Sequence, residues 1–290
     1  MRINEVAFIG LGVMGYPMAG HLTKNGYNVT VYNRTTSKSE KWIKDYKGSM
    51  AKTPGEASLN KQIVFICVGR DQDIIDVMDA DDGILSTIKH NSIIVDHTTA
   101  SADIARKYFT KLKEKNISFL DAPISGGQAG AENGALSIMI GGEKIDFEKV
   151  KPILQSYGKA IELIGPSGSG QIAKMINQIC IAGLVQGLSE AMAFGKKSKV
   201  DMEKVLSVIS KGAAQSWQME NRYRTMLDGK FDYGFAVDWM RKDLLICFNE
   251  AKKNGANLPI TKIIDEYYKQ IQNNGGNRFD TSSLMTLVDK

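Results

Sequence analysis

The fold of this chain of 290 residues is decided by the segment Val6-Ala7-Phe8-Ile9-Gly10-Leu11-Gly12-Val13-Met14-Gly15. Its first four residues are apolar and predict a buried strand. Three glycines follow at the spacing G-x-G-x-x-G, ahead of a stretch that predicts a helix over 14–24. In such a strand–turn–helix unit the first glycine makes the tight turn, the second lets a pyrophosphate approach the backbone, and the third lets helix and strand pack closely. Because the N-terminus of the helix would face the phosphates, the segment predicts a dinucleotide site.

Outward from this segment, short apolar runs alternate with amphipathic stretches through the first half of the chain. Strands are predicted over residues 6–9, 29–32, 63–68, 92–95, 118–120 and 136–140, and further helices over 74–78 and 104–115. Apolar strands separated by helices form parallel sheets that are covered on both faces. We therefore expect residues 1–165 to form an α/β domain of the Rossmann type, with a mostly parallel, doubly wound sheet.

The pattern changes at the loop Gly165-Pro166-Ser167-Gly168-Ser169-Gly170, which is rich in residues that break helices and strands. Apolar residues then recur at helical spacing from Ile172 onward. Further helices are predicted over 201–209, 217–226, 237–253 and 261–273, and no strand is predicted beyond the loop. We therefore expect residues 166–290 to form an all-α domain, joined to the first domain by a long interdomain helix.

The distribution of charge narrows the choice of partners. Lys and Arg number 37 against 32 Asp and Glu, which gives a formal net charge of +5, and they are spread along the chain without a basic block. We therefore expect neither a nucleic acid nor a membrane as partner. Mild positive charge suits an anionic cofactor and a small substrate that bears a carboxylate.

Cysteine and histidine usage points to an ordinary cytoplasmic protein without a metal. Cys67, Cys180 and Cys247 are far apart in the sequence, which favours buried thiols in a reducing compartment. The three histidines show no ligand spacing, so no metal site is predicted. Neither a signal peptide nor an apolar stretch long enough to cross a membrane is recognised.

Asn33-Arg34-Thr35, which follows the second predicted strand, bears on the choice of cofactor. Enzymes that use NAD usually carry an acid about 20 residues past the glycines, where it holds the ribose 2′-hydroxyl. A carboxylate would repel a 2′-phosphate, whereas Arg34 offers a planar fork that suits one. We therefore expect NADP, with NAD as the less favoured cofactor. An Arg34 that is merely a solvated surface residue is the alternative.

Two further stretches carry groups suited to a carboxylate and to proton transfer. Ser125-Gly126-Gly127 lies at the carboxyl edge of the predicted sheet, where a hydroxyl and backbone N–H groups suit a carboxylate, although alone it is an ordinary turn. Lys174 and Asn177 share a face of the helix that follows Gly168-Ser169-Gly170. A lysine at the start of a buried interdomain helix is costly unless paired or functional. The alternative is that both side chains are exposed.

Together these pieces resemble the β-hydroxyacid dehydrogenase family. That family includes 3-hydroxyisobutyrate dehydrogenase and glyoxylate/succinic semialdehyde reductase, and it is related to 6-phosphogluconate dehydrogenase. The resemblance covers essentially the whole chain and rests on four motifs in order. They are the glycine segment through Met18-Ala19, D-A-P-V-S-G-G at 121–127 with Ile124 in place of Val, G-x-G-x-x-x-K-x-x-N at 168–177, and K-D-L at 242–244.

The resemblance implies hydride transfer between NAD(P) and a small β-hydroxy acid, which is interconverted with its semialdehyde or keto acid. It implies that Lys174 is the general acid/base, that Asn177 orients the substrate, and that the N-R-T variant at 33–35 goes with NADP. The helical domain would bind substrate and pair into a homodimer or homotetramer. The residues expected to bind substrate are Ser125, Gly126, Gly127 and Thr99. The residues expected to bind the cofactor are Gly10, Leu11, Gly12, Val13, Met14, Gly15, Asn33, Arg34, Thr35, Val68, Thr99, Lys242 and Asp243.

Three alternatives remain open at this point. The chain would be a glyoxylate/succinic semialdehyde reductase-type enzyme if its substrate is an aldehyde acid. An imine reductase shares the fold but usually holds another residue at the position of Lys174. A non-catalytic NADP-binding scaffold or sensor would be expected to lose that lysine. The sequence leaves open the physiological substrate and the role of His97, which stands where the family more often has an apolar residue.

Overall fold

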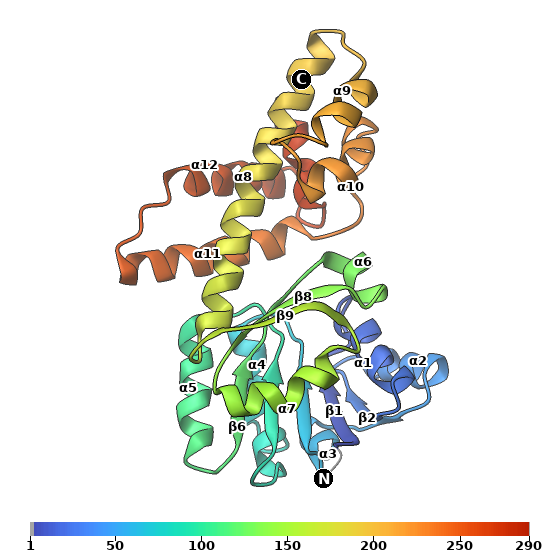
Figure 1. The fold of residues 1–290 in the computed structure, drawn as a ribbon, viewed down its shortest axis with the longest axis vertical. Helices are drawn as coiled ribbons and strands as arrows, with labels where there is room; N and C mark the ends of the chain where they lie inside the picture. Colours follow the sequence, from blue (N-terminus) through green and yellow to red (C-terminus); the bar gives the residue numbers. More distant parts are fainter. Residues whose placement is uncertain (1–2, 290) are drawn as a thin grey trace. The chain divides into compact units, whose positions relative to one another are not determined.

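The structure of the protein is a computed structural model, which describes residues 3–289. The chain divides into two compact units, Met1–Lys174 and Met175–Lys290, here called unit 1 and unit 2. The division falls inside the long helix α8 (Ser169–Lys197), whereas the sequence places the domain boundary before that helix. Figure 1 shows the sheet-containing unit 1 in blue to green and the helical unit 2 in yellow to red.

Unit 1 is built on a nine-stranded sheet in the order β3-β2-β1-β4-β5-β6-β8-β7, with β9 also paired to β8. Its strands are β1 (Glu5–Ile9), β2 (Asn28–Tyr32), β3 (Ser49–Met50), β4 (Ile63–Ile66), β5 (Ile93–Asp96), β6 (Ser118–Asp121), β7 (Ile124–Ser125), β8 (Leu136–Gly141) and β9 (Gly158–Gly165). Strands β1 to β6 pair in parallel, whereas β8 runs antiparallel to β6 and β7 and parallel to β9. The expected mostly parallel Rossmann-type sheet is therefore confirmed.

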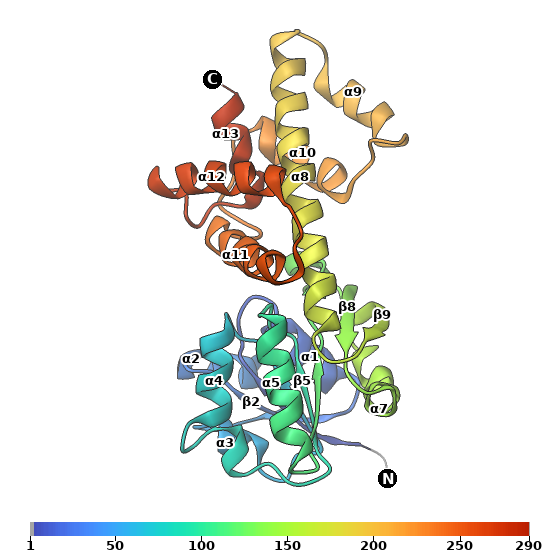
Figure 2. The same cartoon turned by 90° about the vertical axis from the view of Figure 1, so that its left-hand side faces the viewer.

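Helices cover both faces of this sheet, as Figures 1 and 2 show. They are α1 (Gly15–Lys24), α2 (Thr36–Asp45), α3 (Pro54–Ser58), α4 (Asp71–Asp79), α5 (Ala102–Lys113), α6 (Gly127–Glu132) and α7 (Lys144–Leu154), with a 3₁₀ turn at Ile84–Ser86. Neighbouring strand residues point to opposite faces. In β1, Phe8 joins a buried cluster with Leu22 of α1, whereas Ile9 joins a second cluster with Tyr108 of α5. Both faces of the sheet are therefore shielded from water, which is why the strands are almost continuously apolar.

Several elements of unit 1 are absent from the sequence-based expectation. They are α2, α3, α6, α7, β3, β7 and β9. Strand β9 alternates exposed with partly buried residues, because it lies at an edge of the sheet and is bounded by Gly158 and Gly165. In α2 only Ser39 and Trp42 are buried, so its apolar periodicity is too weak to read.

Unit 2 is helical. It continues from α8 through α9 (Met202–Ile209), α10 (Trp217–Leu227), α11 (Val237–Asn254), α12 (Pro259–Asn273), a 3₁₀ turn at Thr281–Leu284 and α13 (Met285–Val288). Helix α8 supplies residues to both apolar clusters of this unit. Val185 packs with residues of α11 and α12, and Met192 packs with residues of α9 and α10. The expected all-α second half and its long helix are confirmed (Figure 2).

One expectation about α8 is corrected. Among the described residues, this helix is long and apolar enough, by length and composition, to cross a membrane. The sequence-based statement that no such stretch exists is therefore wrong. A helix in the core of a soluble protein passes the same test, and α8 contributes buried residues to two apolar clusters.

Candidate functional site

The three glycines after β1 differ in how much space surrounds them, and therefore in why glycine is needed at each position. Gly10 has φ +100°, and a Cβ there would lie 2.3 Å from the carbonyl oxygen of Cys67. A Cβ on Gly15 would lie 2.1 Å from the carbonyl oxygen of Gly10. A Cβ on Gly12 would meet no heavy atom within 4 Å. Gly10 and Gly15 are therefore required by the fold, whereas Gly12 leaves open space beside the backbone, as a bound pyrophosphate requires.

The turn after β2 is tied to this glycine turn. The side-chain oxygen of Asn33 accepts a hydrogen bond from Leu11 N at 2.9 Å, and its amide nitrogen donates to the carbonyl oxygen of Thr35 at 3.1 Å. Asn33 therefore shapes the loop with its whole amide group, a role that the sequence does not suggest. Asn33 lies next to the glycine turn, but both ends of its side-chain amide form hydrogen bonds with backbone groups of the protein.

Arg34 extends from the same turn into solvent. Its side chain is 86% exposed, and one guanidinium nitrogen lies 3.6 Å from a carboxylate oxygen of Asp73 in α4. An exposed pair at this distance contributes little to stability, so Arg34 can exchange this partner for another anion. Thr35 is the N-cap of α2 but makes no side-chain capping hydrogen bond.

The ends of β4 and β5 meet beside the glycine turn. Val68 N donates to the hydroxyl of Thr98 at 3.1 Å, and a Cβ on Gly10 would lie 3.2 Å from a methyl group of Val68. Asp96 accepts from Thr98 N at 2.9 Å, which fixes the turn that carries Thr99. Unit 1 therefore brings Val68 and the Thr98–Thr99 turn to the same sheet edge as Gly10.

His97 is a core residue. It is 1% exposed, its Nδ1 lies 2.7 Å from the carbonyl oxygen of Ala122, and its Nε2 lies 2.9 Å from the hydroxyl of Tyr157. Since a carbonyl only accepts, Nδ1 carries the proton and Nε2 accepts from Tyr157. Burial lowers the pKa of His97 to about 4, so the ring is neutral near pH 7. Its ring also stacks on Phe65, which makes packing the role of this residue.

The Ser125-Gly126-Gly127 turn joins β7 to α6. Ser125 pairs with Ser137 of β8, and Gly126 and Gly127 have φ values of +132° and +61°. Both φ values lie in the region that favours glycine, which explains the pair. A Cβ on Gly127 would meet no heavy atom within 4 Å, so the backbone here is open to a ligand.

Asp121, at the end of β6, anchors the start of α8. It is fully buried, and its carboxylate accepts from Gly168 N at 2.7 Å and from Gln171 N at 3.0 Å. Burial raises the pKa of Asp121, and these backbone donors oppose that shift by stabilising the anion. Gly170 packs so closely that a Cβ would lie 2.5 Å from the carbonyl oxygen of Met139. The Gly-x-Gly lead-in therefore lets the helix start against the sheet edge.

Gln171 is a second anchor, which no motif in the sequence indicates. It is 1% exposed, donates to the carbonyl oxygen of Thr98 at 2.8 Å and accepts from Ala100 N at 3.0 Å. Its amide thus joins the Thr98–Ala100 turn to the first turn of α8. Lys174 follows one turn later on the same side of the helix and is 7% exposed. The expectation of a buried lysine near the start of the interdomain helix agrees with this placement.

In unit 2 the remaining predicted residues belong to one polar network. Lys242 Nζ lies 2.8 Å from one carboxylate oxygen of Asp243, both in α11. The other oxygen of Asp243 accepts from the amide of Gln178 at 2.6 Å, and Gln178 accepts from the amide of Asn177 at 2.8 Å. Asn177, Lys242 and Asp243 are therefore linked through Gln178, a residue that no motif in the sequence indicates.

Two family models together match most of the chain. A family model described as the NAD binding domain of 6-phosphogluconate dehydrogenase matches residues 5–165, and one described as NAD-binding of NADP-dependent 3-hydroxyisobutyrate dehydrogenase matches residues 168–288. The chain belongs to the β-hydroxyacid dehydrogenase family. The chain is 55% identical over 286 residues to an uncharacterized oxidoreductase of Shewanella frigidimarina (strain NCIMB 400), covering 99% of this chain and 98% of the relative.

Two further relatives carry names that describe an activity. A 2-hydroxy-3-oxopropionate reductase of Escherichia coli (strain K12) is 32% identical over 285 residues, covering 98% of this chain and 97% of the relative. A crystal structure of 3-hydroxyisobutyrate dehydrogenase from Salmonella typhimurium is 25% identical, with a TM-score of 0.87, covering 98% of this chain and 99% of that one. The chain thus has the family's nicotinamide-dinucleotide-binding unit, and the open space at Gly12 fits the cofactor.

Proposed function

We propose that this protein interconverts a small β-hydroxy acid and its semialdehyde or keto acid, with Lys174 as the general acid/base. The observation that carries the proposal is the buried Lys174, held one turn after Gln171 in a helix whose start is bonded to Asp121 and to the Thr98–Ala100 turn. This buried position is the place of the acid/base lysine in the family motif that residues 168–177 resemble. The activities named for the Escherichia coli and Salmonella relatives support the same reaction class.

The residues of this chain perform the proton chemistry and hold the substrate. A nicotinamide cofactor, when bound, supplies or accepts the hydride. During reduction the ammonium of Lys174 stabilises negative charge on the carbonyl oxygen and then donates a proton to it. During oxidation the neutral amine accepts the hydroxyl proton. Ser125 and the backbone N–H groups of Gly126 and Gly127 hold the carboxylate, and Asn177 orients the reacting carbon.

A substrate panel tests the proposal. Purified protein is assayed with NADPH and NADH against 3-hydroxyisobutyrate, tartronate semialdehyde, glyoxylate and succinic semialdehyde, with uncharged aldehydes of similar size as controls. We expect turnover of at least one carboxylate-bearing compound and poor turnover of the uncharged ones. Cofactor binding without turnover of any compound would favour a non-catalytic scaffold. Turnover of glyoxylate or succinic semialdehyde above the others would favour the aldehyde-acid reductase alternative.

We propose NADP as the preferred cofactor, because Arg34 is exposed and Asn33, rather than an acid, follows β2. Arg34→Ala should weaken NADPH binding roughly 10- to 100-fold, since a hydrogen bond to a charged group is worth about 1.5–3 kcal/mol. Binding of NADH should change much less, because it lacks the 2′-phosphate. Fluorescence titration measures both dissociation constants. Arg224→Ala in unit 2 removes the same charge from another exposed side chain and serves as the control. Equal losses for the two cofactors would contradict the assignment.

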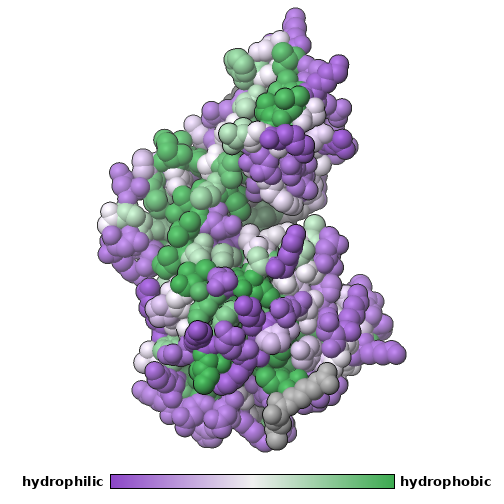
Figure 3. Space-filling model, viewed as in Figure 1, coloured by the Kyte–Doolittle hydropathy of each residue, from purple (hydrophilic) through white to green (hydrophobic). Residues whose placement is uncertain are grey.

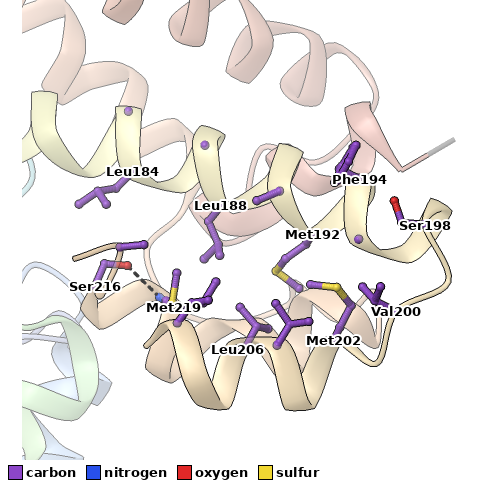
Figure 4. Close-up of a pocket in the computed structure, with 17 residues that line it drawn as sticks. Leu184, Leu188, Met192, Phe194, Ser198, Val200, Met202, Leu206, Ser216 and Met219 are labelled. Atoms are coloured by element: carbon purple, nitrogen blue, oxygen red, sulfur yellow. Dashed lines mark hydrogen bonds between the residues drawn. The ribbon is translucent and has the colours of Figure 1, made fainter. Parts of the chain in front are cut away.

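We propose a homo-oligomer, a dimer or tetramer, that pairs through the helical unit. A groove with a volume of about 610 Å³ lies between α8, α9 and α10 and is lined mainly by apolar residues. Leu184, Leu188 and Met192 of α8 face Leu206 and Met219 across it (Figure 4). Phe194, which also lines the groove, is 76% exposed. Apolar side chains are visible on the surface of unit 2 in Figure 3, and such exposed apolar surface is typical of protein interfaces.

Phe194→Glu should therefore weaken self-association roughly 10- to 100-fold, because burying a phenylalanine is worth about 1.5–3 kcal/mol. Sedimentation velocity across micromolar concentrations measures the change in mass. Ile145→Glu, at a residue of α7 that is 68% exposed, introduces the same charge in unit 1 and should leave the mass unchanged. A wild-type protein that sediments as a monomer throughout this range would rule out the oligomer.

We also propose the cytoplasm as the compartment of this protein. Cys67, Cys180 and Cys247 are free thiols, but only Cys247 is buried. Cys67 is partly exposed and Cys180 is exposed, so the expectation of three buried thiols is wrong for these two. Thiols persist in a reducing compartment, which supports this location.

A further inference from the structure

Gln178 lies at the centre of the polar network of unit 2. It is 2% exposed, and both ends of its side-chain amide are used. The oxygen accepts from the amide of Asn177 at 2.8 Å, and the nitrogen donates to Asp243 at 2.6 Å. Asp243 is also 2% exposed, and its other carboxylate oxygen lies 2.8 Å from Lys242 Nζ. The network therefore runs from Asn177 through Gln178 and Asp243 to Lys242.

The direction of these hydrogen bonds is fixed by their chemistry. An ionised carboxylate only accepts, so the group of Gln178 that faces Asp243 is the NH₂ group and the group that faces Asn177 is the oxygen. A glutamate at 178 would lack the donor, and a methionine of similar length would lack both groups. The site thus requires an amide that donates to one neighbour while accepting from the other.

We infer that Gln178 is a positioning residue for the proposed reaction. It sets the orientation of the Asn177 amide and fixes one carboxylate oxygen of Asp243. The other oxygen of Asp243 lies 2.8 Å from Lys242 Nζ but accepts no hydrogen bond among the described residues, so Gln178 places the charge that faces this ammonium. The inference rests on the proposed function, because Asn177 and Lys242 are expected to touch the substrate and the cofactor. Gln178 itself acts through these neighbours. Its place on α8, one turn after Lys174, lets one helix carry both the proposed acid/base and the residue that organises its surroundings.

The charged and titratable groups near Gln178 have distinct roles. Asp243 and Lys242 form the ion pair on α11, and Lys174 precedes Gln178 by one turn on α8. Cys247 of α11 donates from its thiol to the carbonyl oxygen of Met175 at 3.6 Å, and burial raises its pKa to about 12, so it stays protonated. A new acid at position 178 would therefore interact most strongly with Asp243.

Two variants test this inference. Gln178→Met removes the donor and the acceptor while keeping the length, and we expect kcat to fall about 100-fold, the typical effect of small misplacement at an active site. In Gln178→Glu the new carboxyl faces Asp243, and two adjacent carboxylates raise the pKa of one of them. A protonated glutamate donates to Asp243 as the glutamine does. The kcat of this variant should therefore rise relative to wild type as the pH falls and collapse as the pH rises.

Gln186 offers a matched control on the same helix. It is 8% exposed, and its amide donates to Glu190 at 2.7 Å, so Gln186→Glu also places a carboxyl against a carboxylate. Gln186→Met and Gln186→Glu should leave kcat and its pH profile unchanged, and their melting temperatures show how far a substitution in this helix affects the fold alone.

The measurements are kcat, KM, their pH profiles and the melting temperature of all four variants and the wild type. A Gln178→Met variant that matches Gln186→Met in kcat would overturn the inference while the proposed function stands. The same holds for a Gln178→Glu variant whose pH profile follows that of the wild type. A wild-type protein that turns over no compound of the substrate panel would overturn both.

Discussion

We expect Lys174→Ala to reduce kcat by about 10²- to 10⁴-fold or more, because a positioned acid or base typically contributes that much to the rate. The substitution removes both the proton donor and the charge from a buried place in α8. Binding of NADPH, measured by fluorescence quenching, should change little, since the glycine turn proposed to bind the cofactor phosphates lies at the end of β1. Turnover is measured with the best substrate of the panel.

Lys174→Arg separates the two contributions of the lysine. Arginine keeps the positive charge but hardly gives up a proton near neutral pH. If stabilisation of negative charge dominates, this variant recovers part of the rate; if proton transfer dominates, it is as slow as Lys174→Ala. Near-full turnover by Lys174→Ala would show that the assignment is wrong, and Lys242 would become the next candidate.

The second large effect concerns the glycine turn. A Cβ at position 12 meets no heavy atom within 4 Å, so the backbone leaves room for a side chain to begin there, and we expect Gly12→Val to keep the fold. The added side chain fills the space that the pyrophosphate needs and prevents its hydrogen bonds to the backbone. Since hydrogen bonds to charged groups are worth about 1.5–3 kcal/mol each, loss of two of them predicts at least a 100-fold weaker NADPH complex.

Gly10→Ala is the opposite case in the same turn. Its Cβ would lie 2.3 Å from the carbonyl oxygen of Cys67, and its φ of +100° is strained for alanine. Backbone strain of this kind costs about 1–3 kcal/mol before the steric contact is added. We therefore expect a melting temperature lower by at least about 2 °C, against no change for Gly12→Val. Differential scanning calorimetry without cofactor measures both variants. Unfolding of Gly12→Val, or tight NADPH binding by it, would refute this division of roles.

The parallel sheet could be predicted because its strands are buried on both faces. Every residue of β4 and β5 is buried, so these strands appear in the sequence as apolar runs, and the run of β5 ends at the buried Asp96. The glycine spacing located the first turn for a related reason, since two of its glycines leave no room for a Cβ. Strand β9 was missed because it pairs on one side only and exposes half of its residues.

In the candidate site, the sequence indicated the residues whose own side chain or backbone carries the chemistry, and it did not indicate residues that act through distant partners. Lys174 and Ser125-Gly126-Gly127 carry their chemistry in their own groups, so motif and spacing were enough to select them. Gln171 and Gln178 act through partners 60 or more positions away, such as Thr98 and Asp243, and nothing in the local sequence marks these contacts. Asn33 was selected for the cofactor, yet its amide bonds the backbone of Leu11 and Thr35. For the same reason the buried partners of His97 could not be read from its neighbours in the chain.

The hydrogen bonds that fix the first turn of α8 also limit where insertions and deletions can be tolerated in this chain. Because Asp121 and Gln171 fix the first turn, each residue inserted or deleted between 171 and 178 would turn every later side chain by about 100° around the helix axis. A single such event would carry Gln178 away from Asp243 even if every amino acid kept its chemistry. Beyond α8, the segment between α9 and α10 connects two short helices, and added residues there would leave this angular phase untouched. Length variation among the protein's descendants should therefore collect in such connections and avoid the first two turns of α8.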